Sequence, residues 1–387
     1  MAEKSKVLHI ITRMINGGAD ENTLFTVNGL ARDNYQVALL VGEEHERKMM
    51  QRLEDDVQLY ILASLVRDIS PVNDLRALLF IYRLIKKEKY EIVHTHTAKA
   101  GVLGRVAARM AGVPAIIHTI HGTTFPDTIS FPQRFIYKNL ERFCGWFTDF
   151  FITVGEDMQE KYLQAGIGSP DRYQTVYSGM ELAKFNHAAG LPPARVSSLK
   201  EELGIAPEEI VVGNVARLEA RKGQKFYFQV AARVCEEVGN VRFLVVGDGA
   251  DREKLQQQAG ELGLEDRVVF TGYRDDVEDI FAIIDIKILT SLWEGLPRVL
   301  IQAAAVGRPV VTFAVDGVHE IVREGYNGYI VPIRDVGAMA ERVIRLVQDR
   351  DLREKMGRQA RQLVGDRWTI KRMVTDTGLI YQGMLQP

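Results

Sequence analysis

Short apolar runs alternate with helix-like segments along most of the chain, and this alternation limits the fold more than any other feature. The runs are continuously apolar, which is typical of strands in a parallel sheet covered on both faces. We therefore predict an α/β fold with two doubly wound, Rossmann-like domains that face each other across a cleft. The expected strands are 7–12, 37–41, 57–62, 92–95, 115–120, 150–154 and 173–177 in the first domain, and 210–216, 241–246, 268–271, 283–289, 309–313 and 328–331 in the second.

The chain length and one small-residue stretch predict where the domains meet. A chain of 387 residues exceeds the roughly 250–300 residues at which a single core stops growing. The stretch 187–194 is rich in alanine, glycine and proline, as linkers often are. We place an N-terminal domain at 1–182, a linker at 183–207 and a C-terminal domain at 208–368, and we expect a C-terminal helix at 369–387 to pack back on the N-terminal domain.

Charge and cysteine usage exclude several classes of protein. The formal net charge is −2, so no overall positive field points to a nucleic-acid partner. The two cysteines, Cys144 and Cys235, fall inside helical patterns, and we expect buried thiols in a reducing compartment. The apolar run at 7–12 is too short for a signal peptide or a membrane span, so we expect a cytoplasmic protein.

A glycine turn, Gly295-Leu296-Pro297, separates an expected buried strand from an expected helix at 297–306. Proline suits the first position of a helix, and the N–H groups exposed there attract phosphate. Glu294 stands just before this anion site, where its charge would repel phosphate, so we expect it to bind neutral groups such as sugar hydroxyls. Gln302 lies two turns into the same helix.

Arg217 and Lys222 flank a short loop before the next expected helix. Two cations at a helix N-terminus oppose its dipole, which is unfavourable unless an anion lies between them. This pattern indicates a diphosphate site, because Arg and Lys can clamp phosphate oxygens without a metal ion. The alternative is an exposed basic turn.

Glycines also follow other strands. Gly17-Gly18 follows the first strand, where it would allow a ligand to approach the backbone or form a plain tight turn. This loop lacks the Gly-x-Gly-x-x-Gly fingerprint, which argues against a nicotinamide or flavin enzyme. Gly247 and Gly272 end two strands of the second domain.

Tyr273 and Arg274 follow Gly272 directly and offer a ring and a guanidinium plane on which a nucleobase could stack. An ordinary exposed turn is an equally good interpretation.

Three histidines lie near the ends of adjacent strands of the first domain. His94 and His96 share one face of a strand, but the sequence shows no third ligand nearby, so we predict no metal site. We expect His94 to lie in the core and His96 to turn toward a ligand. His121 precedes a glycine, where it could bind a sugar hydroxyl or be satisfied within the loop. Lys99 is either a solvated charge or an anion contact.

The expected helix 132–147 has an apolar face and an opposite basic face. We expect the apolar face to pack on the core and the basic face to be solvated. The alternative is contact between the basic face and anionic lipid headgroups.

Taken together and in order, these stretches resemble the family 4 glycosyltransferases, retaining enzymes of the GT-B fold. Each motif is weak by itself, whereas the ordered set from residue 17 to residue 328 is specific. The part from His94 to His121 is most similar to members that build bacterial surface polysaccharides or related glycoconjugates. The matching motifs are Gly17-Gly18, Ile120-His121-Gly122, Ser178-Gly179-Met180-Glu181, Gly213 with Arg217, Lys222-Gly223, Gly247-Asp248-Gly249, Phe270-Thr271-Gly272, the segment from Glu294 to Gln302, and Gly325-Tyr326-Asn327-Gly328.

The resemblance implies an N-terminal acceptor-binding domain and a C-terminal donor-binding domain. Arg217 and Lys222 would hold the donor diphosphate, while Gly17 and Gly18 would let the diphosphate and the acceptor approach. Other candidate donor contacts are Gly247, Gly272, Tyr273, Arg274 and Pro297.

For the donor sugar, the resemblance implies that Glu294 binds hydroxyls together with the N–H groups of Gly295 and Leu296. His121 would contact the sugar near the reacting carbon. The family usually has a second glutamate, which binds the ribose hydroxyls, where this chain has Gln302. Glutamine keeps a carbonyl acceptor and loses the charge.

The implied function is a retaining, metal-independent transfer of a sugar from a nucleotide diphosphate donor, UDP by preference, to an acceptor hydroxyl. The implied acceptor is a carbohydrate or lipid-linked molecule, with His96, Lys99 and Arg67 as candidate acceptor contacts. No cofactor is implied, and peripheral contact with the inner face of a membrane stays open. The alternatives are a nucleotide-sugar epimerase of the same architecture and a non-catalytic nucleotide-sugar-binding protein.

Overall fold

The computed structural model describes residues 4–15, 17–32 and 34–385, which form two compact units. Unit 1 comprises the described residues up to Met180 and from Asp366 onward, and unit 2 is Glu181–Gly365. The range that the sequence assigns to a linker holds two helices, α7 (Leu182–Ala188) and α8 (Pro193–Glu202), which belong to unit 2.

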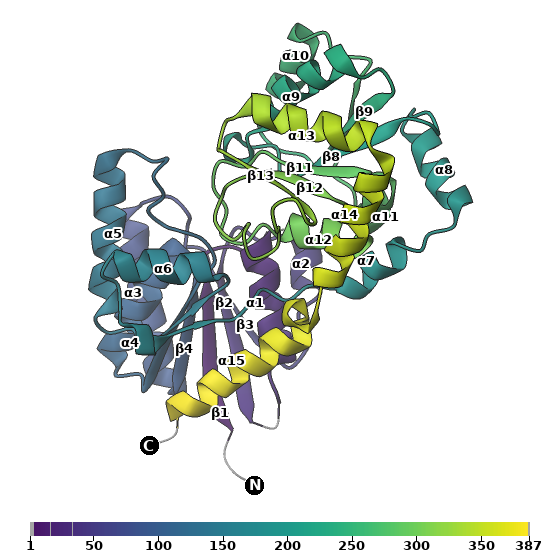
Figure 1. Ribbon diagram of the computed structural model, residues 1–387. Coiled ribbons are helices and arrows are strands. Elements are labelled where there is room, and N and C mark those ends of the chain that lie inside the picture. The colour runs from purple at the N-terminus through teal and green to yellow at the C-terminus, as the bar shows by residue number, and fades with distance from the viewer. Residues whose placement is uncertain (1–3, 16, 33, 386–387) are drawn as a thin grey trace. The chain divides into compact units, whose positions relative to one another are not determined.

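Unit 1 is built around a parallel sheet with the strand order β3-β2-β1-β4-β5-β6-β7 (Figure 1). One face of the sheet packs on α1 and α15, and the other packs on α3 and α4. The strands are β1 (Ser5–Ile11), β2 (Tyr35–Gly42), β3 (Gln58–Leu62), β4 (Ile92–His96), β5 (Ala115–Ile120), β6 (Phe150–Thr153) and β7 (Tyr173–Thr175). The helices are α1 (Gly18–Gly29), α2 (Arg47–Met50), α3 (Pro71–Glu88), α4 (Ala98–Ala111), α5 (Phe131–Gly145), α6 (Glu156–Gln164) and α15 (Ile370–Leu385).

The last helix, α15, returns to unit 1 after the chain has formed unit 2. Its Met373, Ile380 and Tyr381 are buried in the core beside α1. Where the chain crosses between the units, the Met180 N–H donates to the Trp368 carbonyl at 3.0 Å. The C-terminal helix therefore supplies part of the unit 1 core.

Unit 2 contains a second parallel sheet, ordered β10-β9-β8-β11-β12-β13. Its strands are β8 (Ile210–Val215), β9 (Val241–Val246), β10 (Val268–Gly272), β11 (Ile286–Leu289), β12 (Val310–Phe313) and β13 (Gly328–Val331). Its helices after α8 are α9 (Gln224–Glu237), α10 (Arg252–Glu261), α11 (Val277–Ile283), α12 (Arg298–Val306), α13 (Val336–Gln348) and α14 (Arg350–Leu363). The prediction of two doubly wound parallel sheets in separate domains is confirmed.

Each sheet has one point at which the direction of strand addition reverses. In unit 1 this point lies between β1 and β4, and in unit 2 it lies between β8 and β11. Ligands of open parallel sheets bind outside the carboxyl ends of the strands at such switch points. The loops after these four strands are therefore where a site is expected.

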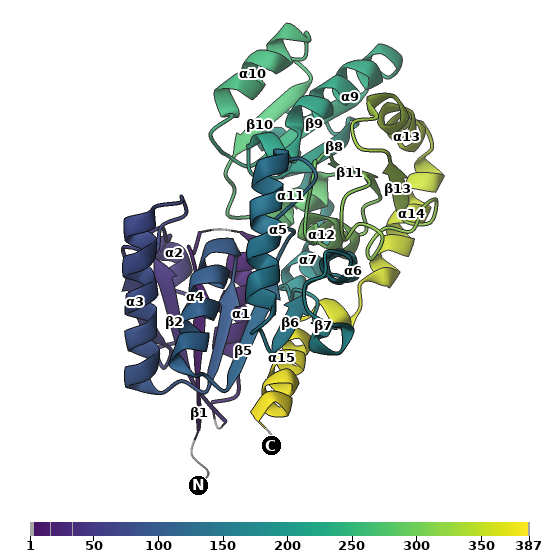
Figure 2. The same cartoon turned by 90° about the vertical axis from the view of Figure 1, so that its left-hand side faces the viewer.

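The surface of α5 corrects one prediction. The apolar face expected to pack on the core is exposed instead: Ile136 is 54%, Phe143 is 47% and Leu140 is 38% exposed. The buried side instead carries Glu141, which accepts from Arg105 at 2.8 Å, and the small residues after it. Because this inward side is charged and narrow, the apolar side chains of α5 turn outward. Figure 2 shows α4 between α5 and α3.

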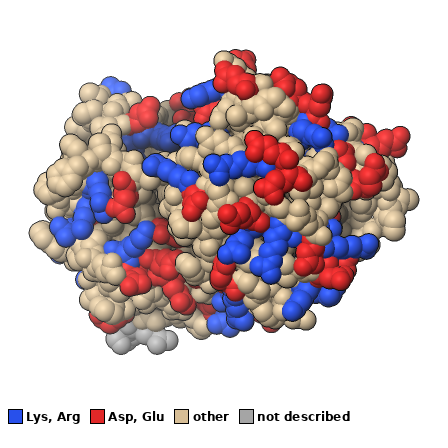
Figure 3. Space-filling model, turned by 45° about the horizontal axis from the view of Figure 1, so that its top comes forward, with Lys and Arg blue, Asp and Glu red and all other residues tan. Residues whose placement is uncertain are grey.

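Among the described residues, no helix is long and apolar enough to cross a membrane. Lys and Arg are interspersed with Asp and Glu over the face shown in Figure 3. This mixing agrees with the small net charge of −2.

Candidate functional site

The switch point of unit 2 brings the loops after β8 and β11 into direct contact. The Leu292 N–H donates to the Arg221 carbonyl at 2.9 Å, and the Thr290 hydroxyl donates to the Lys222 carbonyl at 3.1 Å. Gly223 separates Lys222 from α9 with φ of +63°, and a Cβ there would lie 2.1 Å from the Thr290 carbonyl oxygen. Only glycine allows this approach, so the motif Lys222-Gly223 fixes the distance between the loops.

Lys222 and Glu294 form an ion pair at this contact. The Lys222 Nζ donates to Glu294 Oε1 at 2.7 Å, and Glu294 is 8% exposed. Burial by itself would raise the pKa of Glu294, but the charges of Lys222 and Arg221 outweigh burial and lower it. Glu294 is therefore ionised at neutral pH, and its charge is matched by the cations of the neighbouring loop.

Arg217 lies half-buried in the loop after β8. Two glycines after β9 pack on this loop: a Cβ on Gly247 would lie 2.1 Å from the Ala216 carbonyl oxygen, and one on Gly249 would lie 2.3 Å from the Leu218 carbonyl oxygen. The Gly247 N–H also donates to the Gly272 carbonyl at 2.9 Å. The structure thus places Arg217, Gly247 and Gly272 at one sheet edge, and it gives the first glycine a packing role.

Tyr273 and Arg274 lie beyond that edge. Tyr273 is 55% exposed. Arg274 donates to both carboxylate oxygens of Asp276 at 2.7 Å and to Glu202 of α8 at 2.6 Å. These bonds connect α8 to the loop before α11, which supports the structural interpretation of this turn and leaves only the guanidinium faces for stacking.

The turn Gly295-Leu296-Pro297 is supported by the loop after β12. Gly317, with φ of +73°, lies so close that a Cβ there would be 2.6 Å from the Gly295 carbonyl oxygen. Helix α12 begins at Arg298 with Pro297 as its N-cap, so the expectation that Pro297 is the first helical residue is wrong by one position. Gln302 is half-buried in the second turn of this helix.

Lys287 is a residue of this site that the sequence analysis missed. It is completely buried in β11, where its Nζ donates to the Ile288 carbonyl at 2.7 Å. Burial, and then the charge of Lys222, lowers the pKa of Lys287 to about 7, against an opposing effect of Glu294. A lone lysine inside the apolar run 283–289 was the available signal.

The switch point of unit 1 gathers histidines. Strand pairing places His9 of β1 opposite His94 of β4, and His96 points to the same face two residues later. His96 Nε2 lies 3.0 Å from His9 Nδ1, and His96 Nδ1 lies 3.0 Å from Nε2 of the half-buried His121. His96 is completely buried as the last residue of β4, so the expectation that it turns outward to a ligand is wrong.

β1 places a third histidine, His9, beside the two that the sequence pattern showed. His9, His94 and His96 each offer a ring nitrogen, and these nitrogens lie within 4.8 Å of one another. His9 escaped notice because it is far away along the chain. Its position between Leu8 and Ile10, on the opposite face from both, was the available signal.

The other candidate residues of unit 1 are dispersed. Lys99 donates to Asp74 at 2.6 Å and to the Asp68 carbonyl, so it secures the start of α3 rather than being solvated. Arg67 is exposed in the segment before that helix. Gly17 is the N-cap of α1 and accepts at its carbonyl from the Glu21 N–H at 3.0 Å, while Gly18 is the first helical residue. Asn16 lies outside the described residues.

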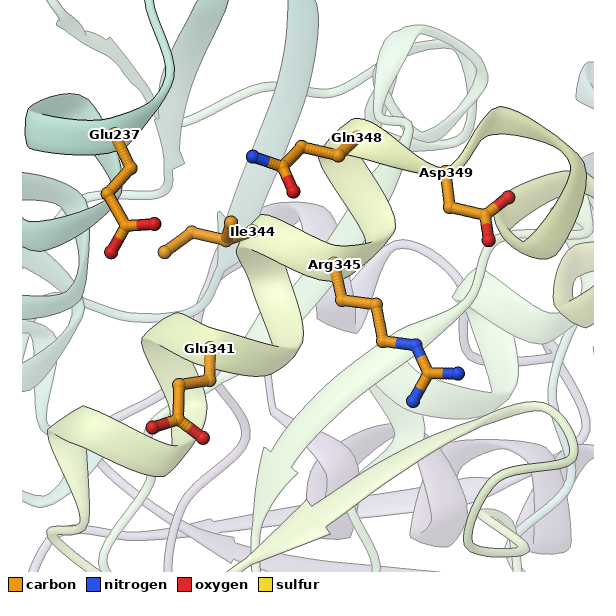
Figure 4. A pocket seen from close by; sticks show the side chains of 6 residues that line it. All are labelled: Glu237, Glu341, Ile344, Arg345, Gln348 and Asp349. Atoms are coloured by element: carbon orange, nitrogen blue, oxygen red, sulfur yellow. The ribbon is translucent and has the colours of Figure 1, made fainter.

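A surface pocket of unit 2 lies away from these loops (Figure 4). It is lined by the end of α9 and by α13, whereas the candidate site lies near the start of α9. Three of its side chains are acidic and one is basic, a charge balance that disfavours an anionic nucleotide. The lining residues are Glu237, Glu341, Ile344, Arg345, Gln348 and Asp349.

Comparison with known proteins gives a consistent result over both units. Residues 17–179 match the Glycosyl transferase 4-like domain, and residues 196–363 match Glycosyl transferases group 1. The chain is 29% identical over 353 residues to the UDP-Gal:alpha-D-GlcNAc-diphosphoundecaprenol alpha-1,3-galactosyltransferase of Escherichia coli, covering 90% of this chain and 89% of that protein. It is 27% identical over 318 residues to the N-acetyl-alpha-D-glucosaminyl L-malate synthase of Bacillus anthracis, covering 82% of this chain and 81% of that one.

Solved structures show the same fold. The Anabaena protein Alr3699/HepE, solved with UDP and glucose, superimposes with a TM-score of 0.83 at 22% identity, covering 98% of this chain and 99% of that one. WaaG, a glycosyltransferase involved in lipopolysaccharide biosynthesis, superimposes with a TM-score of 0.77 at 16% identity, covering 96% of this chain and 99% of that one. The chain therefore belongs to the family 4 glycosyltransferases and is a glycosyltransferase of the GT-B fold.

Proposed function

We propose that this enzyme is a retaining glycosyltransferase that moves a sugar from a UDP-sugar to a hydroxyl of a carbohydrate or lipid-linked acceptor, in the synthesis of a bacterial surface polysaccharide or glycoconjugate. The observation that carries the proposal is the Lys222–Glu294 pair at 2.7 Å, at the switch point of unit 2. The Escherichia coli relative, named for UDP-Gal and a diphosphoundecaprenol acceptor, supports both substrate classes.

In this proposal, the donor diphosphate binds Arg217 and Lys222. Both residues follow β8, and Lys222 precedes the N-terminus of α9, whose N–H groups add positive potential. The bond to Glu294 orients Lys222, so the lysine meets the diphosphate without rearranging. As the sugar–phosphate bond breaks, these cations stabilise the developing charge on the leaving group.

Glu294 acts on the sugar rather than on the phosphate. Its carboxylate is ionised and uses Oε1 for Lys222, and we assign Oε2 to donor sugar hydroxyls. The N–H groups of Gly295 and Leu296 assist, and Gln302 accepts from the ribose through its side-chain carbonyl. His121 contacts the sugar near the reacting carbon.

The reaction needs neither a metal ion nor a side-chain base in this proposal. Arg217 and Lys222 supply the positive charge at the diphosphate, and a leaving-group oxygen takes the acceptor proton. Adding a chelator should leave the rate unchanged. Strict dependence on added Mg²⁺ would contradict this part of the proposal.

Incubation of the purified enzyme with single UDP- and GDP-sugars tests the proposal against both alternatives. A transferase consumes the donor quickly only when an acceptor is present. An epimerase would convert the donor without an acceptor, and a binding protein would bind UDP in calorimetry and never consume the donor.

We also propose that α5 binds an anionic membrane surface, where a lipid-linked acceptor would be presented. Phe131 and Phe135 of α5 are exposed, as are Arg134 between them and Trp146 directly after the helix, and Lys138 is half-buried. This composition is typical of helices that lie in the membrane interface. Phe135→Ser together with Trp146→Ser should abolish sedimentation with phosphatidylglycerol vesicles. Equal sedimentation of this variant and the wild type would contradict the proposal.

A further inference from the structure

A continuous series of hydrogen bonds runs through the core of unit 1 and ends at His121. It crosses from the loop after β5 to β4, β1 and α15 and then returns to β4 and β5. Every member except His121 is at least 97% buried. We call this series the relay. In order, its members are His121, His96, His9, Tyr381, His94 and Thr119.

The first half of this relay joins imidazoles alone. His121 Nε2 lies 3.0 Å from His96 Nδ1, and His96 Nε2 lies 3.0 Å from His9 Nδ1. Since a neutral imidazole has one N–H and one lone pair, each ring must donate at one nitrogen and accept at the other. The proton position on one ring thus determines it on the next.

The second half passes through the hydroxyl of Tyr381. This oxygen lies 3.2 Å from His9 Nε2 and 2.5 Å from His94 Nδ1. His94 Nε2 then lies 2.6 Å from the Thr119 hydroxyl. Tyr381 is contributed by the C-terminal helix. His9 and Tyr381, which are 372 positions apart in the sequence, therefore share one proton arrangement.

All the buried histidines of the relay are neutral. Burial, and then the Arg32 charge, lowers the pKa of His9 to about 3. Burial also lowers the pKa of His94 and of His96 well below the usual value, with neighbouring histidines adding to the effect. Each ring therefore carries one proton at neutral pH, which is the number that the relay requires.

Two proton arrangements satisfy every bond and also use the tyrosine proton in one of these bonds, and they run in opposite directions. In one, each histidine carries its proton on Nε2, Tyr381 donates to His94, and His94 donates to Thr119. In the other, each carries its proton on Nδ1, and Tyr381 donates to His9. The two short bonds at His94 cannot both have hydroxyl donors, because His94 carries one proton, so the direction is decided at His9. Hydroxyl donors make shorter bonds than N–H donors, and the 3.2 Å bond therefore fits the His9 N–H as donor to Tyr381, which places the protons of His9, His96 and His121 on Nε2.

We propose that this relay holds His121 in a single tautomer, with its proton on Nε2, so that Nδ1 can only accept a hydrogen bond from a substrate hydroxyl. His96, His9 and Tyr381 are then positioning residues for His121. The tautomer is a property of the free protein, and only the contact with substrate rests on the proposed function.

The same histidines could instead be regarded as metal ligands, because three of their nitrogens lie within 4.8 Å of one another. However, both ring nitrogens of His9, His94 and His96 already have hydrogen-bond partners. A metal ion would displace one bond at each ring. Because every ring nitrogen of these three histidines already has a hydrogen-bond partner, the relay is favoured over a metal site. A bound metal is one of the outcomes that the test can reveal.

Histidine ¹⁵N NMR of the free protein tests the proposal, since protonated and unprotonated ring nitrogens resonate far apart. The chain has 8 histidines, and His121→Asn identifies the signals of His121. Tyr381→Phe removes one oxygen from the middle of the relay. Tyr35→Phe is the matched control, because Tyr35 stacks edge-on against Tyr381 at 5.7 Å but donates to the Gly378 carbonyl outside the relay.

We expect His121 in the wild type and in Tyr35→Phe to show one tautomer, protonated at Nε2. Tyr381→Phe should show a mixture of both tautomers, because neither direction of the shortened relay satisfies His9. Should Tyr381→Phe not fold, Thr119→Val, which removes the terminal hydroxyl, should produce the same mixture. Unchanged His121 signals in the relay variants, or a wild type protonated at Nδ1, would overturn the proposal.

Two further measurements sharpen the result. Elemental analysis should find no stoichiometric metal, and a stoichiometric metal that is lost in His9→Asn would overturn the relay. With donor and acceptor, Tyr381→Phe should lower kcat about tenfold, the equivalent of one hydrogen bond, with little change in KM for the donor. A tautomer change without any loss of kcat would overturn the positioning role and leave the donor site of unit 2 untouched.

Discussion

Both switch points of this enzyme hold buried polar side chains at the edge of a sheet, but these side chains are charged in unit 2 and neutral in unit 1. In unit 2, Lys222 and Glu294 are charged and match each other at 2.7 Å. In unit 1, His9, His94 and His96 are neutral and satisfy each other through shared protons. A charged pair can respond when an anion arrives, whereas a neutral relay keeps one side chain in one orientation. We therefore associate the first with a diphosphate and the second with the direction of a single hydrogen bond.

Removing one charge from the unit 2 pair should give the largest effect. Lys222→Ala should lower turnover about 10²–10³-fold, because it removes a cation that stabilises the leaving group and leaves Glu294 buried without its partner. Steady-state assays with a UDP-sugar and an acceptor measure this loss. Lys225→Ala is the control, since that lysine is exposed on the first turn of α9, the helix that follows Lys222. A Lys222→Ala enzyme with wild-type turnover would remove the pair from the mechanism.

Lys287→Met should change the stability of the protein, because it removes a buried charge at the switch point of unit 2. The folded-state pKa of about 7 lies below the value of 10.5 expected when the chain is unfolded, so the unfolded chain binds the proton more strongly. Below pH 7, the buried charge of Lys287 therefore lowers the free energy of unfolding of the wild type by its full amount. This loss of stability disappears as the pH rises toward 10.5. We expect the variant to be more stable by about 2–4 kcal/mol at pH 7, with the gain shrinking at high pH. Denaturant unfolding at pH 7 and pH 10 measures both values, and a pH-independent difference would contradict the assignment.

His9→Asn should produce a smaller change in the pH dependence of stability, and this change is confined to acid. The folded-state pKa of His9 is about 3 and the usual value is 6.5, so the stability present above pH 6.5 is lost as the pH falls toward 3. Removing one such histidine should reduce the slope of unfolding free energy against pH by about 1.4 kcal/mol per unit below pH 6. Urea unfolding at intervals between pH 7 and pH 4.5 measures the slope. A slope equal to that of the wild type would mean that His9 is protonated in the folded protein.

Much of this architecture could be predicted from the sequence, because continuous apolar runs followed by glycine turns leave few alternatives to a doubly wound sheet. The order of the motifs also brought Lys222 and Glu294 to one site, although they are 72 residues apart. Both predictions depend on local patterns that recur at strand ends.

The failures have a common physical cause, which is that burial is decided by neighbours that a local pattern does not reveal. His96 is buried because β1 supplies His9 as a partner for its Nε2. The apolar side chains of α5 face outward because the Arg105–Glu141 pair occupies its inner side. In each case the deciding partner is distant in sequence, so periodicity alone assigned the wrong environment.

The central claim is that Lys222 binds the diphosphate while Glu294 binds the sugar. Calorimetric titration of UDP, which has no sugar, into the wild type, Lys222→Ala and Glu294→Gln tests it most directly. We predict that Lys222→Ala weakens UDP binding at least about tenfold, equivalent to one charged hydrogen bond, and that Glu294→Gln binds UDP at least as tightly as the wild type. If Lys222→Ala bound UDP as tightly as the wild type, or if Glu294→Gln alone lost UDP binding, the account of this site would be contradicted.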